Sequence, residues 1–149
     1  MAVVIIFIMV IIDQLIKYWA STYLKPKGSI PVIKNIFSFT YVENRGAAFG
    51  ILQNQRWLFI VLTIVICIGI LYYLYTEDNM PFIFRISLCL VLGGAIGNLI
   101  DRIKNGYVVD MFHITFIDFP VFNMADCFVV VGTILLAYYL LFIEGKEFK

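Results

Sequence analysis

Four long apolar segments leave this chain few possible folds. Each is about 20 residues long, which is the length that an α-helix needs to cross the hydrocarbon core of a bilayer. The four segments are residues 2–19, 57–75, 81–100 and 122–143. The sequence therefore predicts an all-α membrane protein with four transmembrane helices, in which residues 1–149 form a single integral membrane domain.

The overall composition agrees with this prediction and excludes several classes of protein. Hydrophobic residues make up 62% of the 149 residues and charged residues only 14%, with a mean hydropathy of +0.96. A soluble domain is close to half apolar, and a small domain cannot bury so much apolar surface. An ordinary cytosolic enzyme, a disordered linker and a disulfide-stapled secreted module are therefore excluded. The formal charge of +1 comes without a run of Lys or Arg, so we expect no nucleic-acid partner.

The first apolar segment is either a cleaved signal peptide or a retained helix. It lacks a basic n-region and a small-residue cleavage site, and it carries two charged residues, Asp13 and Lys17. We therefore interpret it as a retained helix. The two charged residues are one helical turn apart, so they share a face and can form an ion pair. Such a pair near a membrane end can be a structural anchor or part of a functional site, and the sequence leaves both open.

The third apolar segment contains a motif for close helix packing. Gly93 and Gly97 lie in the sequence GGAIG. This small-xxx-small pattern lets the backbones of neighbouring helices approach closely. We therefore expect the third helix to lie in close contact with its neighbours.

The basic residues of the loops bear on the orientation of the chain in the membrane. An even number of spans places both termini on the same side. Most basic residues lie in the loops after the first and third spans, namely Lys25, Lys27, Lys34, Arg45, Arg56, Arg102 and Lys104. A literal positive-inside count places these two larger loops in the cytoplasm. The rule is weakest for functional loops that fold onto the membrane, so the count is a weak guide.

Polar groups at membrane depth are the candidates for chemistry, because ionisable side chains are costly there. They lie in three parts of the chain. These are residues 44–49 in the first large loop, residues 98–102 with residues 108–112, and residues 122–127 at the start of the fourth span. We expect the functional site to be formed from these parts.

Asp126 has two possible roles. Asn123 is a good N-cap for the fourth helix, and an acid at the third helical position resembles a capping box. Alternatively, the connection between the third and fourth spans could return Asp110 to the same membrane face, next to Asp126. Two close carboxylates in a low dielectric share one proton, so one can act as general base for a water and the other as general acid. The length of chain between Asp110 and Asp126 allows the two carboxylates to meet, but it does not require them to meet.

Asp101 competes with Asp110 as the partner of Asp126. It lies at a helix C-terminus, where its charge opposes the helix dipole, so an ion-paired or solvated structural role is favoured. Arg102 suits that helix end, yet its forked donors could equally hold a substrate carbonyl or phosphate. Asn98 lies one helical turn before Arg102 on the same face. Because intramembrane asparagine often only hydrogen-bonds between helices, its role stays open.

A thiol–imidazole mechanism is a weaker alternative. Cys127 and the single histidine, His113, could in principle form a nucleophile and its base. However, Cys127 neighbours an acid, which disfavours a thiolate, and residues 112–116 alternate in a way that predicts a β-strand. Cys67, Cys89 and Cys127 lie in or beside apolar segments without close pairing. We therefore expect buried thiols rather than a disulfide or a metal site.

Five motifs occur in order along almost the whole chain. They are Asp13-Gln14 with Lys17, Asn44-x-Gly46-Ala47-Ala48-Phe49, Gly93-Gly94-Ala95-Ile96-Gly97-Asn98 running into Asp101-Arg102, Val108-Val109-Asp110, and Phe122-Asn123-x-Ala125-Asp126. In this order they closely resemble the bacterial lipoprotein signal peptidase family (signal peptidase II). The length of the chain and the number of spans agree with the resemblance.

The resemblance implies an aspartic endopeptidase without a metal or an organic cofactor. Such an enzyme removes the signal peptide of a diacylglyceryl-modified prolipoprotein by cutting just before the lipidated cysteine. The implied catalytic pair is Asp110 and Asp126. The positions implied to line the pocket, hold substrate or support the pair are Asn44, Gly46, Asn98, Arg102 and Asn123, and those implied to give structural support are Asp13 and Lys17.

The resemblance also implies a location and a topology. The protein would lie in the bacterial inner (cytoplasmic) membrane, with cytoplasmic termini and with both larger loops and the active site facing outward, and we follow this over the Lys/Arg count. The first loop would form a small extracytoplasmic β-sheet that cradles the substrate, with part of the loop on the membrane as a lid. The alternating run 36–42 predicts one strand of that sheet.

The expected partners are diacylglyceryl-modified prolipoproteins and membrane lipids, and we expect a monomer. The alternative function is a small transporter or proton channel that uses intramembrane carboxylates. Such proteins usually contain internal repeats or interrupted helices, and the sequence shows neither.

Overall fold

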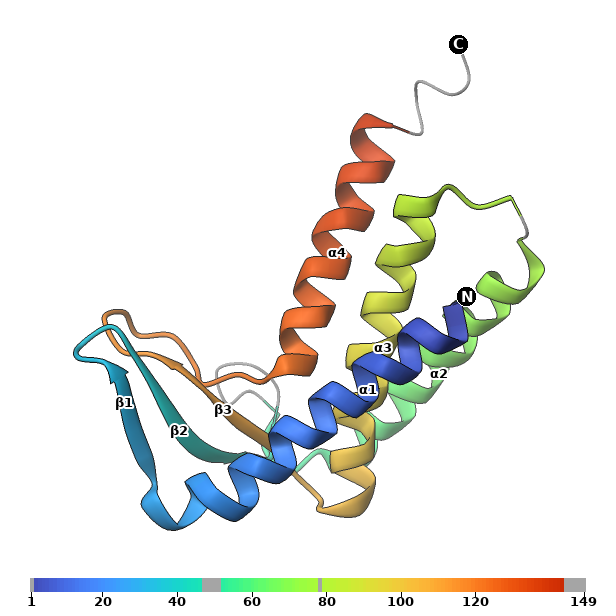
Figure 1. Cartoon of the computed structure of the whole chain (residues 1–149). Coiled ribbons are helices and arrows are strands. Elements are labelled where there is room, and N and C mark those ends of the chain that lie inside the picture. The colour runs from blue at the N-terminus through green and yellow to red at the C-terminus, as the bar shows by residue number, and fades with distance from the viewer. Residues whose placement is uncertain (1, 47–51, 78, 144–149) are drawn as a thin grey trace.

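Helices of membrane-spanning length lie side by side, with a small β-sheet at one end (Figure 1). The computed structural model describes residues 2–46, 52–77 and 79–143. Within these residues, the helices long and apolar enough to cross a membrane are α1 (Ala2–Trp19), α2 (Arg56–Thr76), α3 (Phe82–Lys104) and α4 (Met124–Phe142). The four predicted spans are therefore confirmed, with ends that shift by a few residues.

The outer faces of the helices are apolar, as contact with lipid requires. Phe7 on α1, Val61 on α2 and Leu141 on α4 each expose more than half of their surface. α3 lies between the other three helices and packs against each of them. It also has the largest buried share of the four. The polar residues that α3 carries are therefore the ones most enclosed by protein.

Glycines let α3 approach its neighbours closely. A β-carbon at Gly93 would lie 3.0 Å from a methionine side chain of α1, and one at Gly97 would lie 2.5 Å from Oδ2 of Asp13. A β-carbon at Gly94 would collide with the backbone oxygen of Ala125 on α4. The close packing predicted from the GGAIG motif is confirmed. It places α1 and the start of α4 against the same stretch of α3.

Gly97→Ala should destabilise the protein, because the added methyl group has to displace the buried Asp13 carboxylate. Gly69→Ala on α2 is the matched control, since a β-carbon at Gly69 meets nothing within 4 Å. Thermal unfolding in detergent should show a lower Tm for Gly97→Ala, corresponding to about 1–3 kcal/mol of overpacking strain. Gly69→Ala should be neutral or stabilising by up to about 1 kcal/mol. Equal Tm values for the two variants would contradict the close approach of α1 and α3.

A three-stranded antiparallel sheet, in the order β1-β2-β3, lies where α1 and α3 end and α4 begins (Figure 1). β1 (Ser29–Ile33) and β2 (Phe37–Asn44) form a hairpin in the first large loop. β3 (Val108–Ile114) comes from the connection between α3 and α4. The sheet expected in the first loop is confirmed, but a strand from a distant part of the chain completes it.

Two differences from the predicted element boundaries affect the region around the cavity. β3 begins before the predicted strand 112–116, and residues 115–118 form a turn instead. α3 continues one turn beyond the predicted end of the third span, so the helix includes Asp101. The prediction followed the last apolar residue, whereas the next turn is stabilised by contacts that its polar side chains make inside the protein. Gly106 then adopts a φ of 83°, which glycine tolerates, and the chain turns into β3.

The two faces of β3 serve different purposes, because successive side chains of a strand point to opposite faces. Val109 and Met111 form a buried cluster with Ala20 and Leu24, which belong to a helical turn (Ala20–Leu24) that follows α1. Asp110, together with Val108 and Ile114 at the two ends of β3, lines a cavity. The hydrophobic contact with the end of α1 therefore fixes the side of the sheet on which Asp110 lies.

Candidate active site

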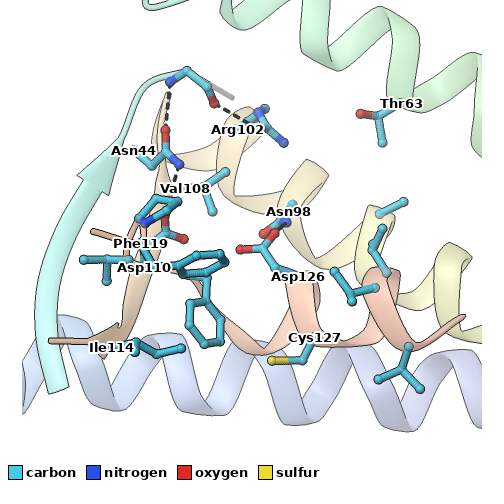
Figure 2. Close-up of a pocket in the computed structure, with 18 residues that line it drawn as sticks. Asn44, Thr63, Asn98, Arg102, Val108, Asp110, Ile114, Phe119, Asp126 and Cys127 are labelled. Atoms are coloured by element: carbon cyan, nitrogen blue, oxygen red, sulfur yellow. Dashed lines mark hydrogen bonds between the residues drawn. The ribbon is translucent and has the colours of Figure 1, made fainter. Parts of the chain in front are cut away.

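A cavity of about 650 Å³ lies between the sheet, α3 and the start of α4 (Figure 2). Its polar lining includes Asn44, Gly46, Asn98, Arg102, Asp110 and Asp126. Much of the remaining wall is apolar and includes the three valines at 129–131 of α4. The three predicted parts of the chain therefore meet here. Motif residues 47–49 lie outside the described residues.

Asp110 is held by β3 and is 1% exposed. Its register partner on β2 is Val42, so Asn44, two residues further along β2, lies diagonally opposite on the same face. Nδ2 of Asn44 donates to Oδ2 of Asp110 over 2.9 Å. Nδ2 of Asn123 donates to Oδ1 of Asp110 over 2.6 Å. Both carboxyl oxygens therefore accept a hydrogen bond from a side-chain amide.

The environment of Asp110 changes its acidity. Its pKa is raised to about 7, first by burial and second by the negative charge of Asp126. The hydrogen bonds from Asn44 and Asn123 act in the opposite direction, because N–H donors favour the charged form of a carboxyl group. Asp110 is therefore a carboxyl group that can hold a proton near neutral pH.

Asp126 lies in the first turn of α4, and Figure 2 shows its carboxylate turned toward that of Asp110 across the cavity. The predicted capping box is confirmed: Oδ1 of Asn123 accepts from the Asp126 N–H over 3.0 Å, and Oδ2 of Asp126 accepts from the Asn123 N–H over 3.1 Å. Oδ1 of Asp126 accepts from Nδ2 of Asn98 over 2.8 Å. Oδ2 of Asp126 thus caps the helix, while Oδ1 contacts Asn98 of α3. The capping role therefore does not exclude a catalytic role for Asp126.

The segment that precedes α4 returns along β3. The backbone N–H groups of Met111 and Phe112 donate to the Phe122 carbonyl over 3.0 and 2.8 Å, and Phe122 forms a β-bridge with Phe112. The next residue, Asn123, therefore reaches Asp110 with its side chain, and α4 starts directly after it. This return brings Asp110 to the same cavity as the acid in the first turn of α4.

Arg102 supplies a positive charge to the cavity. It lies in the last turn of α3, and its Nη2 donates to the Gly46 carbonyl over 3.4 Å. The guanidinium lies 4.9 Å from the ring centroid of Phe59 on α2, a geometry in which a cation is attracted to the ring face. The positive charge of Arg102 interacts electrostatically with the carboxylates of Asp126 and Asp110. Arg102 therefore connects the first loop to the helices at the edge of the carboxylate pair.

Asp13 and Lys17 form the predicted ion pair, with 2.9 Å between Nζ of Lys17 and Oδ2 of Asp13 and almost no exposure of either side chain. Lys17 also lies 3.2 Å from Oδ2 of Asp101 and donates to Oδ1 of Asn98 over 2.8 Å. Oδ1 of Asp13 accepts from the Ala125 N–H over 2.9 Å. Asp13, Lys17 and Asp101 form an ion cluster that joins α1 to α3 and to the start of α4.

Asp101 belongs to the ion cluster. It is 2% exposed, and its Oδ2 also accepts from the Val109 N–H over 3.0 Å. The ion-paired structural role predicted for Asp101 is therefore confirmed, and the solvated alternative is wrong. Nε2 of Gln14 donates to Oδ1 of Asp101 over 3.3 Å and to the Gly97 carbonyl over 3.2 Å. Sequence reasoning missed this contribution of Gln14, for which its place beside Asp13 was the available signal.

The thiol–imidazole alternative has no support in this geometry. Cys127 lines the cavity, but His113 lies on the opposite face of β3 from Asp110, with Nδ1 3.3 Å from the Thr40 hydroxyl. Thr63 of α2 is a wall residue that the sequence did not single out for this cavity. Among residues 2–46, 52–77 and 79–143, no three His, Cys, Asp or Glu side chains are grouped as a metal ion would require.

The chain is similar to known proteins along nearly its whole length. Residues 5–142 match the family described as signal peptidase (SPase) II. The chain is 51% identical over 146 residues to the lipoprotein signal peptidase of Caldanaerobacter subterraneus subsp. tengcongensis, covering 97% of this chain and 99% of the relative. It is 48% identical over 145 residues to the lipoprotein signal peptidase of Clostridioides difficile, covering 97% of each.

Solved structures agree with the same assignment. One, described as a bacterial membrane enzyme, has a TM-score of 0.87 and 35% identity, covering 94% of this chain and 87% of that chain. A second with the same description has a TM-score of 0.85 and covers 95% of this chain and 93% of that chain. Since its sequence matches along nearly its whole length, the chain belongs to the signal peptidase II family.

Proposed function

We propose that Asp110 and Asp126 are the catalytic pair of an aspartic endopeptidase that removes the signal peptide of diacylglyceryl-modified prolipoproteins. The observation that carries the proposal is the pair of carboxylates that faces one cavity, each held by amide N–H groups. As a member of the signal peptidase II family, the chain is a multi-pass bacterial membrane protease that acts on prolipoproteins. The comparisons give no support to the transporter or proton channel.

In the first half of the reaction, the shared proton resides on Asp110. This carboxyl group is buried and has a pKa of about 7, whereas Asp126 is only partly buried and is the proposed general base. Asp126 takes a proton from a water molecule as the water oxygen attacks the scissile carbonyl carbon. Asp110 gives its proton to the carbonyl oxygen, and the product is a neutral tetrahedral diol.

In the second half, the two groups exchange roles. Asp126 donates the proton that it took from water to the nitrogen of the leaving amine. The C–N bond breaks, and Asp110 takes a proton from one hydroxyl group of the diol as the new carboxyl group forms. Asp110 is then protonated and Asp126 ionised again, so the pair is ready for the next substrate without a cofactor.

The other polar residues of the cavity are placed to hold the substrate. The guanidinium of Arg102 can donate to a peptide or ester carbonyl, and it already donates to the Gly46 carbonyl. Asn44 lies at the end of β2, where it both holds Asp110 and borders the cavity. We infer that these residues align the substrate backbone with the carboxylate pair.

The apolar wall of the cavity suits the acyl chains of a lipidated substrate. The valines at 129–131 lie beyond Asp126 along α4, and Ala95 lies on the facing helix α3. A diacylglyceryl group that enters sideways from the bilayer can pack here while the peptide bond reaches the polar end of the cavity. Cleavage is therefore expected to depend on the lipid.

We further propose that the sheet and cavity face the outer side of the inner (cytoplasmic) membrane and that both termini face the cytoplasm. α1 starts and α4 ends at the end opposite the sheet (Figure 1), so an outward-facing cavity requires cytoplasmic termini. We also propose that the protein acts as a monomer, since both carboxylates of the proposed catalytic pair come from the same chain and face one cavity.

Cleavage of a diacylglyceryl-modified prolipoprotein, compared with its unlipidated form, tests the proposed function. The purified protein in detergent or lipid should cleave only the lipidated form, and mass spectrometry should place the cut just before the lipidated cysteine. Equal cleavage of both forms would disprove the dependence on the lipid. If the folded protein cleaved neither form, the proposed function would be wrong, and ion-flux assays would then test the transporter.

A further inference from the structure

We propose that Lys17 is a positioning residue for the catalytic pair. It sets the orientation of the Asn98 amide and, through it, that of Asn123, so that N–H groups point at both catalytic carboxylates. Because the proposal concerns how these carboxylates are held, it rests on the proposed function. It goes beyond the ion pair between Lys17 and Asp13, which by itself explains only how α1 is anchored.

The ammonium group of Lys17 uses its three N–H donors inside the protein. Its side chain is 3% exposed, and Nζ lies 2.9 Å from Oδ2 of Asp13 and 3.2 Å from Oδ2 of Asp101. The third contact, 2.8 Å to Oδ1 of Asn98, is with a neutral amide. Two ion pairs would balance the charge of Lys17 without this contact. The contact between Lys17 and Asn98 therefore needs an explanation other than charge neutralisation.

The contact with Lys17 determines which way round the Asn98 amide lies. An asparagine amide has an acceptor oxygen on one side and an NH₂ donor group on the other, whereas an ammonium group can only donate. Oδ1 of Asn98 must therefore face Lys17, which directs Nδ2 toward Oδ1 of Asp126, 2.8 Å away. The reversed amide would place NH₂ against the ammonium group and a carbonyl oxygen against the carboxylate, and both contacts are repulsive.

The same oxygen of Asn98 orients the buried side chain of Asn123. Nδ2 of Asn123 donates to Oδ1 of Asn98 over 3.2 Å and to Oδ1 of Asp110 over 2.6 Å. The oxygen of Asn123 then faces the first turn of α4, where it accepts from the Asp126 N–H over 3.0 Å. A reversed Asn123 would bring its oxygen against those of Asn98 and Asp110. The donor direction set by Lys17 therefore reaches both members of the catalytic pair.

The direction of the Asn98 N–H group matters for Asp126, the proposed general base. N–H donors hold a carboxylate in place and favour its charged form, whereas a carbonyl oxygen turned toward Asp126 would repel that form. A protonated Asp126 cannot take a proton from water. The residues proposed to align the substrate, Arg102 and Asn44, have described hydrogen bonds to Gly46 and Asp110 and not to Lys17. Loss of Lys17 is therefore expected to lower kcat and to leave KM nearly unchanged.

A merely structural Lys17 would act through stability instead. Asp13 accepts from the backbone of α4, and Asp101 accepts from the backbone of β3, so the ion cluster also holds these elements together. Removing Lys17 alone leaves two buried carboxyl groups without their counter-charge, which is strongly destabilising. A decisive comparison therefore starts from Asp101→Asn, in which one of these charges is already absent.

The experiment compares Asp101→Asn with the charge-compensated double variant Lys17→Gln/Asp101→Asn. Glutamine can donate or accept, so it imposes no direction on the Asn98 amide. We expect kcat of the double variant to be about 10- to 100-fold below that of Asp101→Asn, the loss typical of one hydrogen bond to a charged group. KM for the lipidated prolipoprotein should stay within about threefold. Equal kcat values in the two variants would overturn the proposal.

Asn98→Asp provides a second measurement that leaves Lys17 in place, and it applies even if the double variant does not fold. It keeps the shape of the side chain and the contact with Lys17, but it puts an oxygen where the N–H group faced Asp126. We expect a similar loss in kcat with KM nearly unchanged, and an unchanged kcat would overturn the proposal. Activity in Asp126→Asn would instead refute the proposed catalytic pair, so the two failures are distinguishable.

Discussion

Asp110→Asn and Asp126→Asn should each abolish cleavage of the lipidated prolipoprotein and leave the protein folded. Asparagine keeps the size of the side chain and one acceptor oxygen, so the helix cap at Asp126 retains a partner. An amide cannot take a proton from water or give one to the scissile carbonyl. Because each acid–base role contributes about 10²- to 10⁴-fold, we expect kcat/KM to fall about 1000-fold or more. A gel-shift cleavage assay with long incubations, together with Tm in detergent, measures both effects.

Two further aspartates serve as controls for this prediction. Asp118→Asn changes an exposed residue in the turn after β3 and should retain full activity. Asp101→Asn should lose less activity than either variant of the catalytic pair, or lose it together with a lower Tm, because Asp101 belongs to the ion cluster. A well-folded, inactive Asp101→Asn protein together with an active Asp110→Asn protein would show that the catalytic pair is wrongly assigned.

Cleavage should weaken as the pH rises above about 7, because the pKa of Asp110 is raised to about 7 by burial and by Asp126. Below that value Asp110 holds the proton that it gives to the carbonyl oxygen, and above it the proton is lost. We expect kcat/KM to fall about tenfold per pH unit on the alkaline side. A pH profile of initial cleavage rates measures this, and a rate that stays constant up to pH of about 9 would contradict the role of Asp110 as the acid.

The stability of the protein has to be followed at each pH, because Asp110 affects it with the same sign. The folded protein binds this proton more tightly than the unfolded chain, for which the ordinary value is 3.8. The contribution of Asp110 to the free energy of unfolding is therefore complete below 3.8 and is lost as the pH rises through about 7. Measuring Tm at each pH separates unfolded protein from a folded protein that has lost its acid.

Asn44→Ala tests whether Asp110 causes the fall in kcat/KM above pH of about 7, which is the alkaline limb of the pH profile. The hydrogen bond from Asn44 lowers the pKa of Asp110, so its removal should move the limb to higher pH. Asp118→Asn should leave the limb where it is. A limb that stayed in place in Asn44→Ala, or moved to lower pH, would mean that another group controls it.

Much of the secondary structure could be predicted because its causes are local. The four spans follow from the length of each apolar segment, and the helices end within a few residues of the predicted positions. The cap of α4 could be predicted because Asn123 and Asp126 lie within one helical turn of each other. The pairing of Asp13 with Lys17 was predictable for the same reason.

Other parts of the site could not be predicted because they depend on contacts between distant segments. The hydrogen bond from Asn44 to Asp110 requires the register of β2 and β3. The contact of Lys17 with Asn98 requires the close packing of α1 against α3 that the glycines permit. Neither the strand register nor the helix contact leaves a pattern within one segment of the sequence.

The sequence by itself determined the membrane spans, the helix cap and the polar residues available for chemistry, because hydrophobic length and local hydrogen bonding act within a single segment. Only the tertiary structure decided how three aspartates divide between two sites. Asp101 lies in the ion cluster with Lys17, whereas Asp110 and Asp126 face one cavity. The surroundings of each carboxylate come from segments that only the folded protein brings together.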